Sequence, residues 1–140
     1  MGNTISITKK VSFEDIQFLI KQKSRNHLLI NTLPINEQNC LIRGTVNVSN
    51  EEKIVNENIY NSDMYIVIYG KNSNEDNLVQ KYSQLENLGF KNVYIYPGGL
   101  FEWLCLQDIY GDDEFPTTSN QLDILKYKPH NSISVLRLCN

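Results

Sequence analysis

The sequence predicts a single α/β domain in which a mainly parallel sheet is covered by helices on both faces. Three short runs are uncharged and rich in β-branched and aromatic residues, which is typical of strands buried on both sides. They are residues 27–32, 65–69 and 93–96. Between and around them lie segments with apolar residues at helical spacing, at 13–23, 51–59, 77–88 and 100–108. Because this alternation favours parallel pairing, we expect three layers around one core.

Glycine and proline indicate where these elements end. Pro34 should end the first strand ahead of a loop or single helical turn at 34–39, and Gly89 suits the position after helix 77–88. A further short strand is expected within residues 41–48, where Gly44 is interpreted as a close approach of two backbone segments. Gly70 allows the chain to turn after residues 65–69. In a parallel sheet, the loop that it starts is the expected place for a functional site.

Composition narrows the function classes. The 140 residues carry a net charge of −3 and form no basic stripe, which argues against nucleic acid as a partner. The three cysteines, Cys40, Cys105 and Cys139, include no close pair, so we expect a reducing, cytoplasmic compartment without disulfides. His27 and His130 lack the spacing to cysteine that a zinc site requires, and we expect no metal or cofactor.

The N-terminus carries a lipidation signal. Gly2 follows Met1, and Ser6 stands at the position that the N-myristoylation pattern requires. Lys9 and Lys10 follow as membrane-proximal basic residues. One myristoyl chain binds membranes only marginally, on the order of 10⁴ M⁻¹, and each lysine adds about 1 kcal/mol at an anionic surface. We therefore expect residues 1–10 to form an arm that attaches weakly to a cytoplasmic membrane face and needs a protein partner or multiple copies to stay there.

Three stretches resemble motifs of the rhodanese-like domain. Residues 41–48 (LIRGTVNV) resemble the family's His-Ile-Pro-Gly-Ala-Ile-Asn stretch, and residues 66–70 (IVIYG) resemble the strand that delivers the catalytic cysteine. Residues 93–103 (VYIYPGGLFEW) resemble the closing strand, Gly-Gly turn and tryptophan helix. The resemblance covers roughly residues 11–110 and implies a central, mainly parallel, five-stranded sheet. Residues 111–140 are then a C-terminal extension.

The departures from the family pattern imply a catalytically inactive member. Gly70 stands where active relatives have the cysteine that carries a persulfide, and glycine offers no nucleophile. Glu75 stands where the family tends to have arginine, and residues 31–33 (NTL) replace the family's Asp-x-Arg motif. The degenerate active-site loop comprises Gly70, Lys71, Asn72, Ser73, Asn74 and Glu75. Its polar side chains are expected to be exposed and suited to gripping a protein partner.

Two function classes follow. The first is a membrane-tethered binding or scaffold module, and the AT-rich coding bias suggests a protist, a parasite or a large DNA virus, where it would be a virion component. The alternative is a sulfurtransferase or phosphatase-like enzyme whose chemistry has moved to Cys40 or Cys105, although neither has a cationic neighbour.

Two stretches of the C-terminal extension, residues 111–140, carry sequence signals for local structure. Thr118 and Gln121 predict a capped helix that docks Leu122, Ile124 and Leu125. The apolar run 133–138 is open to four interpretations: a disordered end, an added edge strand, a partner-binding segment, or packing on its own domain.

Overall fold

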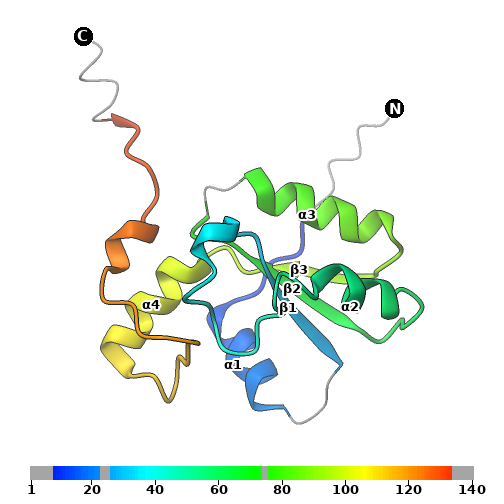
Figure 1. Cartoon of the computed structure of the whole chain (residues 1–140), viewed down its shortest axis with the longest axis horizontal. Helices are drawn as coiled ribbons and strands as arrows, with labels where there is room; N and C mark the ends of the chain where they lie inside the picture. Colours follow the sequence, from blue (N-terminus) through cyan, green and yellow to red (C-terminus); the bar gives the residue numbers. More distant parts are fainter. Residues whose placement is uncertain (1–7, 23–25, 74–75, 134–140) are drawn as a thin grey trace.

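A computed structural model describes residues 8–22, 26–73 and 76–133 of the chain. Three parallel strands form the sheet in sequential order: β1 (His27–Asn31), β2 (Tyr65–Tyr69) and β3 (Asn92–Ile95). His27 lies opposite Tyr65, and Tyr65 opposite Asn92, so the strands start in step (Figure 1). The carboxyl ends of all three therefore meet at one edge of the sheet.

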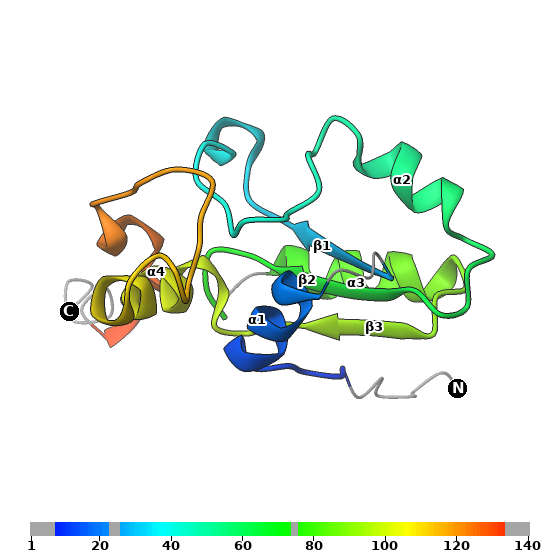
Figure 2. The same ribbon diagram turned by 90° about the horizontal axis from the view of Figure 1, so that it is seen from below.

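Helices cover both faces, as predicted (Figure 2). Helices α1 (Phe13–Lys21) and α4 (Gly99–Tyr110) pack on one face, and α2 (Glu51–Glu57) and α3 (Asp76–Asn87) on the other. The alternation of side chains along β2 explains this division. Val67 and Tyr69 enter the cluster under α1 and α4, whereas Ile66 and Ile68 enter the cluster under α2 and α3.

The sheet has fewer full strands than expected. In the described part of the chain each outer edge carries one bridged residue instead of a strand: Thr45 beside Leu29 of β1, and Lys10 beside Ile95 of β3. The prediction of a strand centred on residues 45–48 is therefore wrong. Gly44 has φ +92°, and a Cβ at this position would meet no atom within 4 Å, so the glycine turns the chain away instead of marking a close approach.

Short helical pieces agree only in part with the predictions. The turn expected after Pro34 is a 3₁₀ helix, η1 (Ile35–Glu37). The helix expected from Thr118 is wrong, because the extension instead forms a short 3₁₀ helix, η2 (Ile124–Tyr127). Of the three residues predicted to dock, Ile124 packs partly buried against the core, whereas Leu122 and Leu125 are exposed and Tyr127 is fully buried. An aromatic ring buries more apolar area than either leucine, which favours this outcome.

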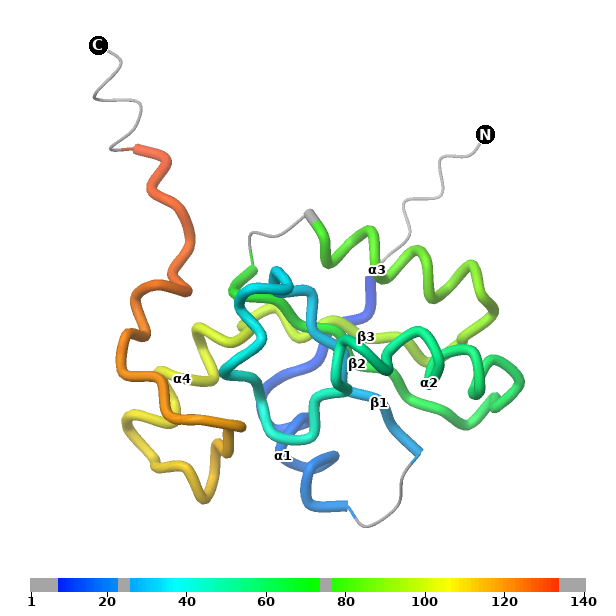
Figure 3. Tube along the Cα trace, in the orientation of Figure 1, coloured from blue at the N-terminus to red at the C-terminus, as the bar shows by residue number. Residues whose placement is uncertain are grey.

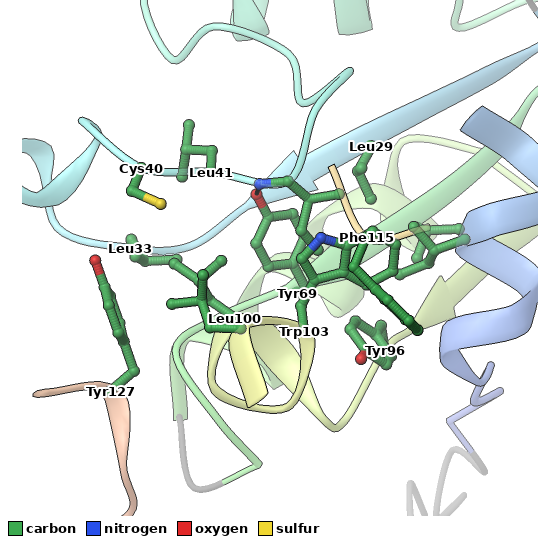
Figure 4. Close-up of a cluster of buried hydrophobic side chains, with 14 residues drawn as sticks. Leu29, Leu33, Cys40, Leu41, Tyr69, Tyr96, Leu100, Trp103, Phe115 and Tyr127 are labelled. Atoms are coloured by element: carbon green, nitrogen blue, oxygen red, sulfur yellow. Dashed lines mark hydrogen bonds between the residues drawn. The ribbon is translucent and has the colours of Figure 1, made fainter. Parts of the chain in front are cut away.

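The extension shares the core of the domain. It folds back along α4 (Figure 3) and contributes Phe115 and Tyr127 to the cluster under α1 and α4. Trp103, which lies in the segment 100–108 with apolar residues at helical spacing, is fully buried at the centre of this cluster (Figure 4). Its ring lies edge-on to Phe115 at 5.0 Å between centroids, and its Nε1 donates to the Pro116 carbonyl at 3.1 Å.

Some predicted apolar faces are less buried than their periodicity indicated. Phe18 on α1 is 62% exposed and Val79 on α3 is 55% exposed, although both belong to stripes that the sequence predicts to face the core. Helix α1 begins at a capping residue, Ser12, whose N–H donates a hydrogen bond to Asp15 Oδ2 at 2.9 Å. No helix in the described ranges is long and apolar enough to span a membrane.

Candidate functional site

The degenerate active-site loop leaves the sheet at the carboxyl end of β2. Tyr69, the last residue of β2, is fully buried and ties this strand end to residues 42–45. Its hydroxyl accepts the Ile42 N–H at 3.1 Å and shares a hydrogen bond of 2.7 Å with Thr45 Oγ1. Desolvation raises the pKa of Tyr69, so the phenol stays protonated at neutral pH. Gly70 follows directly and is buried, so the loop begins inside the domain.

The N-terminus of α4 closes on this loop. The Leu100 N–H donates to the Gly70 carbonyl at 2.9 Å, and the Phe101 N–H donates to the Lys71 carbonyl at 2.8 Å. The approach is close because Gly99 has φ +65° and no side chain. A free helix N-terminus is a natural anion site. These two amides, however, are already occupied by the carbonyls of the loop.

Asn72 points inward, which corrects the prediction of an exposed loop. The side chain is 8% exposed, and its Nδ2 donates to the Tyr127 carbonyl at 2.8 Å. Because Tyr127 is itself fully buried, this bond fastens the C-terminal extension over the loop. Ser73 is exposed, as predicted. Asn74 and Glu75 lie outside the described residues.

The cation at the start of the loop is paired. Lys71 Nζ lies 2.8 Å from Glu37 Oε2, and both side chains are mostly shielded from solvent. A carboxylate this close offsets the attraction that the ammonium would otherwise exert on an anionic substrate. The loop therefore offers little positive potential in its described part.

Asn31, at the position of the aspartate in the family's Asp-x-Arg motif, makes hydrogen bonds that stabilise the local fold. Asn31 is buried, and its Oδ1 accepts the Leu33 N–H at 3.0 Å and Gln38 Nε2 at 2.8 Å. Its Nδ2 donates back to Gln38 Oε1 at 3.0 Å. Both ends of the amide are thus used to shape the turn before η1. Leu41, which replaces the family's histidine, is buried in the core.

Neither described cysteine is set up as a relocated nucleophile. Cys40 is fully buried, and its Sγ lies 3.4 Å from the Ser119 carbonyl. Burial raises the pKa of the Cys105 thiol, with smaller contributions from Asp108 and Glu102. A raised pKa lowers the thiolate fraction on which nucleophilic chemistry depends. Cys139 lies outside the described residues, and the described ranges contain no cluster of metal-ligating side chains.

The basic pair of the N-terminal arm lies at the edge of β3. Lys9 Nζ donates to the Lys91 carbonyl at 3.0 Å and lies 5.7 Å from the centre of the Tyr94 ring. Lys10 is exposed and bridges Ile95. Both lysines are exposed residues. Gly2, the predicted acylation site, lies outside the described residues.

Comparison with known proteins assigns the chain to a family. A family model for the rhodanese-like domain matches residues 16–105, which is more than half of the sequence. The chain belongs to the rhodanese-like family. This match includes the loop at Gly70 and the Gly-Gly turn, so the departures described above are departures within the family. No curated protein matches the chain.

Solved structures share the rhodanese-like fold at low identity. The rhodanese-like domain of the Alr3790 protein from Anabaena superposes with a TM-score of 0.57 at 16% identity, covering 90% of this chain and 88% of that one. The single-domain sulfurtransferase RDL2 from Saccharomyces cerevisiae has a TM-score of 0.51 at 18% identity, with 81% and 99% covered. A possible tyrosine phosphatase from Rhodopseudomonas palustris has a TM-score of 0.53 at 16% identity, with 70% and 80% covered.

Sequence reasoning located the loop of this rhodanese-like domain but missed three residues that shape it. Tyr127 is an isolated aromatic between two lysines, and that contrast is the one local signal that could have singled it out. Glu37 carries no signal for its pairing with Lys71, because nothing local distinguishes it from a solvated carboxylate. The sequence assigns Gly99 to a turn, whereas its contact with the loop depends on the packing of α4.

Proposed function

We propose that this rhodanese-like domain is a non-catalytic binding or scaffold module. The observation that carries the proposal is the state of the loop at residues 70–72. Gly70 provides no nucleophile, the Leu100 and Phe101 amides of α4 are occupied by loop carbonyls, and Asn72 is tied to the extension. A site for sulfur or phosphoryl transfer needs a nucleophile and free donors for an anion. In this chain the described groups serve packing instead.

The alternative is an enzyme with relocated chemistry. It has some support, because relatives of the same fold include a sulfurtransferase and a possible tyrosine phosphatase. The burial of Cys40 and the raised pKa of Cys105 argue against it. We therefore favour the binding module and test it against sulfur transfer directly.

The natural protein should release no thiocyanate from thiosulfate and cyanide above the uncatalysed rate. Gly70→Cys should recover little or nothing, because the new thiol lacks a cationic neighbour that would lower its pKa. Gly70→Cys combined with Glu75→Arg adds the missing charge and should be the minimum change that gives a detectable rate. A colorimetric thiocyanate assay on the three proteins measures this series.

Turnover by the natural protein would contradict the proposal of an inactive domain. Cys40→Ser and Cys105→Ser would then locate the nucleophile, since loss of the rate in one of them identifies the thiol in use. A phosphatase assay on a chromogenic aryl phosphate runs in parallel, and we expect no hydrolysis there either.

The proposed module is held at the cytoplasmic face of a membrane by a myristoyl group on Gly2. Support comes from the Gly2/Ser6 spacing and from Lys10, whose side chain is exposed beside β3. Attachment through one chain is weak, so a protein partner would prolong it. Ser73 is the exposed described residue of the loop that such a partner would meet. In a viral setting the same arrangement fits a protein on the inner side of a virion membrane.

Co-expression with an N-myristoyltransferase should add one myristoyl group to the protein, and Gly2→Ala should abolish the addition in intact-mass spectrometry. Lys10→Gln should weaken binding of the acylated protein to anionic vesicles about fivefold, because one surface lysine contributes about 1 kcal/mol there. Lys128→Gln, also exposed but on the extension, is the control and should change binding little. An unmodified Gly2 under these conditions would refute the anchor.

A further inference from the structure

A groove of about 380 Å³ lies between α1 and the sheet. Its apolar lining combines residues of α1 and its approach with residues of β2 and β3: Val11, Phe18, Leu19, Tyr65, Val67 and Tyr94. The volume falls in the range of small-molecule sites in proteins. The groove lies at the side of α1 and is separate from the loop at Gly70.

The groove is open because α1 covers the sheet incompletely. Ile16 is the fully buried residue of this helix, whereas Phe18 is 62% exposed on its rim. On the sheet side, Tyr65 is 45% exposed and stacks on Tyr94 with 6.3 Å between ring centroids. Three aromatic rings, those of Phe18, Tyr65 and Tyr94, thus present apolar surface to water, which is unfavourable unless something covers it.

The lining suits an uncharged, flexible chain. Its acidic member is Asp15, and the Oδ2 of that carboxylate accepts hydrogen bonds from the Ser12 N–H at 2.9 Å and the Ser12 hydroxyl at 3.4 Å. The carboxylate therefore caps α1, and its Oδ2 is already hydrogen-bonded within the protein. The other polar groups of the lining are uncharged: the amide of Gln22 and the hydroxyls of Tyr65 and Tyr94. Nothing in this set selects a charged headgroup.

The N-terminal arm joins the domain beside this groove. Val11 forms part of the lining, and Lys9 Nζ lies 5.7 Å from the centre of the Tyr94 ring. Gly2 precedes Lys9 by seven residues. An extended chain of that length spans up to about 25 Å, so the amide of Gly2 can reach any part of the groove. A tether this short also raises the effective concentration of an attached group to the order of millimolar.

We propose that the myristoyl chain on Gly2 occupies this groove when the protein is away from a membrane; this rests on the lipid attachment proposed above. The tether, the apolar lining and the open volume favour the chain's own acyl group over a peptide from a partner, which would have to bind without a tether. The groove and the bilayer then compete for one acyl chain. Only molecules whose acyl chain is outside the groove can bind a membrane. The apparent membrane affinity is therefore reduced in proportion to the fraction of such molecules.

The first test compares methyl signals of acylated and unacylated protein by NMR, after mass spectrometry has established the acylation. Acylation should shift the methyl signals of Val11, Leu19 and Val67. Those of Val55 and Leu85 should stay unchanged, because they line a cavity between α2 and α3 on the other face of the sheet. Unchanged groove signals, or shifts at Val55 and Leu85 instead, would overturn the proposal.

The second test measures binding of the acylated protein to neutral phosphatidylcholine vesicles, where basic residues contribute little. Phe18→Glu places a charge on the rim of the groove at an exposed helical position. It should release the chain and tighten vesicle binding about three- to tenfold. Val79→Glu makes the same change at an exposed position of α3, on the other face, and should stay within about twofold of the natural protein.

The outcomes separate the two proposals. If mass spectrometry shows no acyl group, the lipid anchor fails, and occupation of the groove by that chain fails with it. If the acyl group is present and Phe18→Glu binds vesicles no more tightly than Val79→Glu, the anchor stands and the groove proposal is wrong.

Discussion

Gly99→Ala should lower the free energy of unfolding by about 2–4 kcal/mol, as the sum of backbone strain and overpacking. A Cβ at this position would lie 2.7 Å from the Gly70 carbonyl oxygen and 2.9 Å from the Asn72 nitrogen. Both contacts are with backbone, which cannot swing away as a side chain can. The φ of +65° adds strain for any residue with a Cβ. Urea denaturation followed by tryptophan fluorescence measures the change.

Gly89→Ala provides the matched control. Gly89 also has a positive φ, +108°, yet a Cβ there would meet no atom within 4 Å. This variant should lose about 1 kcal/mol, from the backbone conformation alone. The difference between the two variants isolates the close approach of α4 to the loop. Equal losses would mean that the loop and the start of α4 do not pack as described.

Trp103→Ala should cost about 3–5 kcal/mol, the usual range for removing a large aromatic side chain from a core. The indole is fully buried and lies edge-on to both Tyr96 and Phe115. Its loss also leaves the Pro116 carbonyl without its donor. Because the indole joins α4 to the extension, the variant should expose the extension to limited proteolysis before the rest of the domain unfolds.

Tyr110→Ala on the same helix tests whether this effect is specific. Tyr110 is mostly exposed, so its removal should cost less than about 1 kcal/mol. Trp103→Phe retains an aromatic ring but not the donor and should fall between the two alanine variants. A loss at Trp103→Ala as small as that at Tyr110→Ala would contradict a shared core. Thermal and urea unfolding of the three variants provide the comparison.

The three layers could be predicted from the sequence because they depend on local periodicity. Residues 65–69 alternate between two buried faces, and runs of this kind separated by helical patterns leave few topologies other than a parallel α/β sheet. The segment around residue 45 was harder to predict. A segment that forms a full strand and a segment with one bridged residue can have the same composition. Only the extent of pairing with β1 distinguishes them.

The absence of a nucleophile at residue 70 was likewise determined by the sequence alone. Glycine has no side chain in any fold, so no packing can restore the thiol. The burial of Trp103 was predictable from local pattern, since the residue falls in the apolar helical stripe of residues 100–108.

The tertiary structure decided how the remaining groups are used. Asn72 and Tyr127 are 55 residues apart, and their hydrogen bond exists because the extension folds back along α4. The same asparagine would be a solvated loop residue without that contact. The groove beside Phe18 also follows from tertiary packing, because periodicity assigns the residue to an apolar stripe but not the depth at which α1 sits. The local pattern of apolar residues determines which side chains are favourable to bury, whereas long-range packing determines which of them are buried.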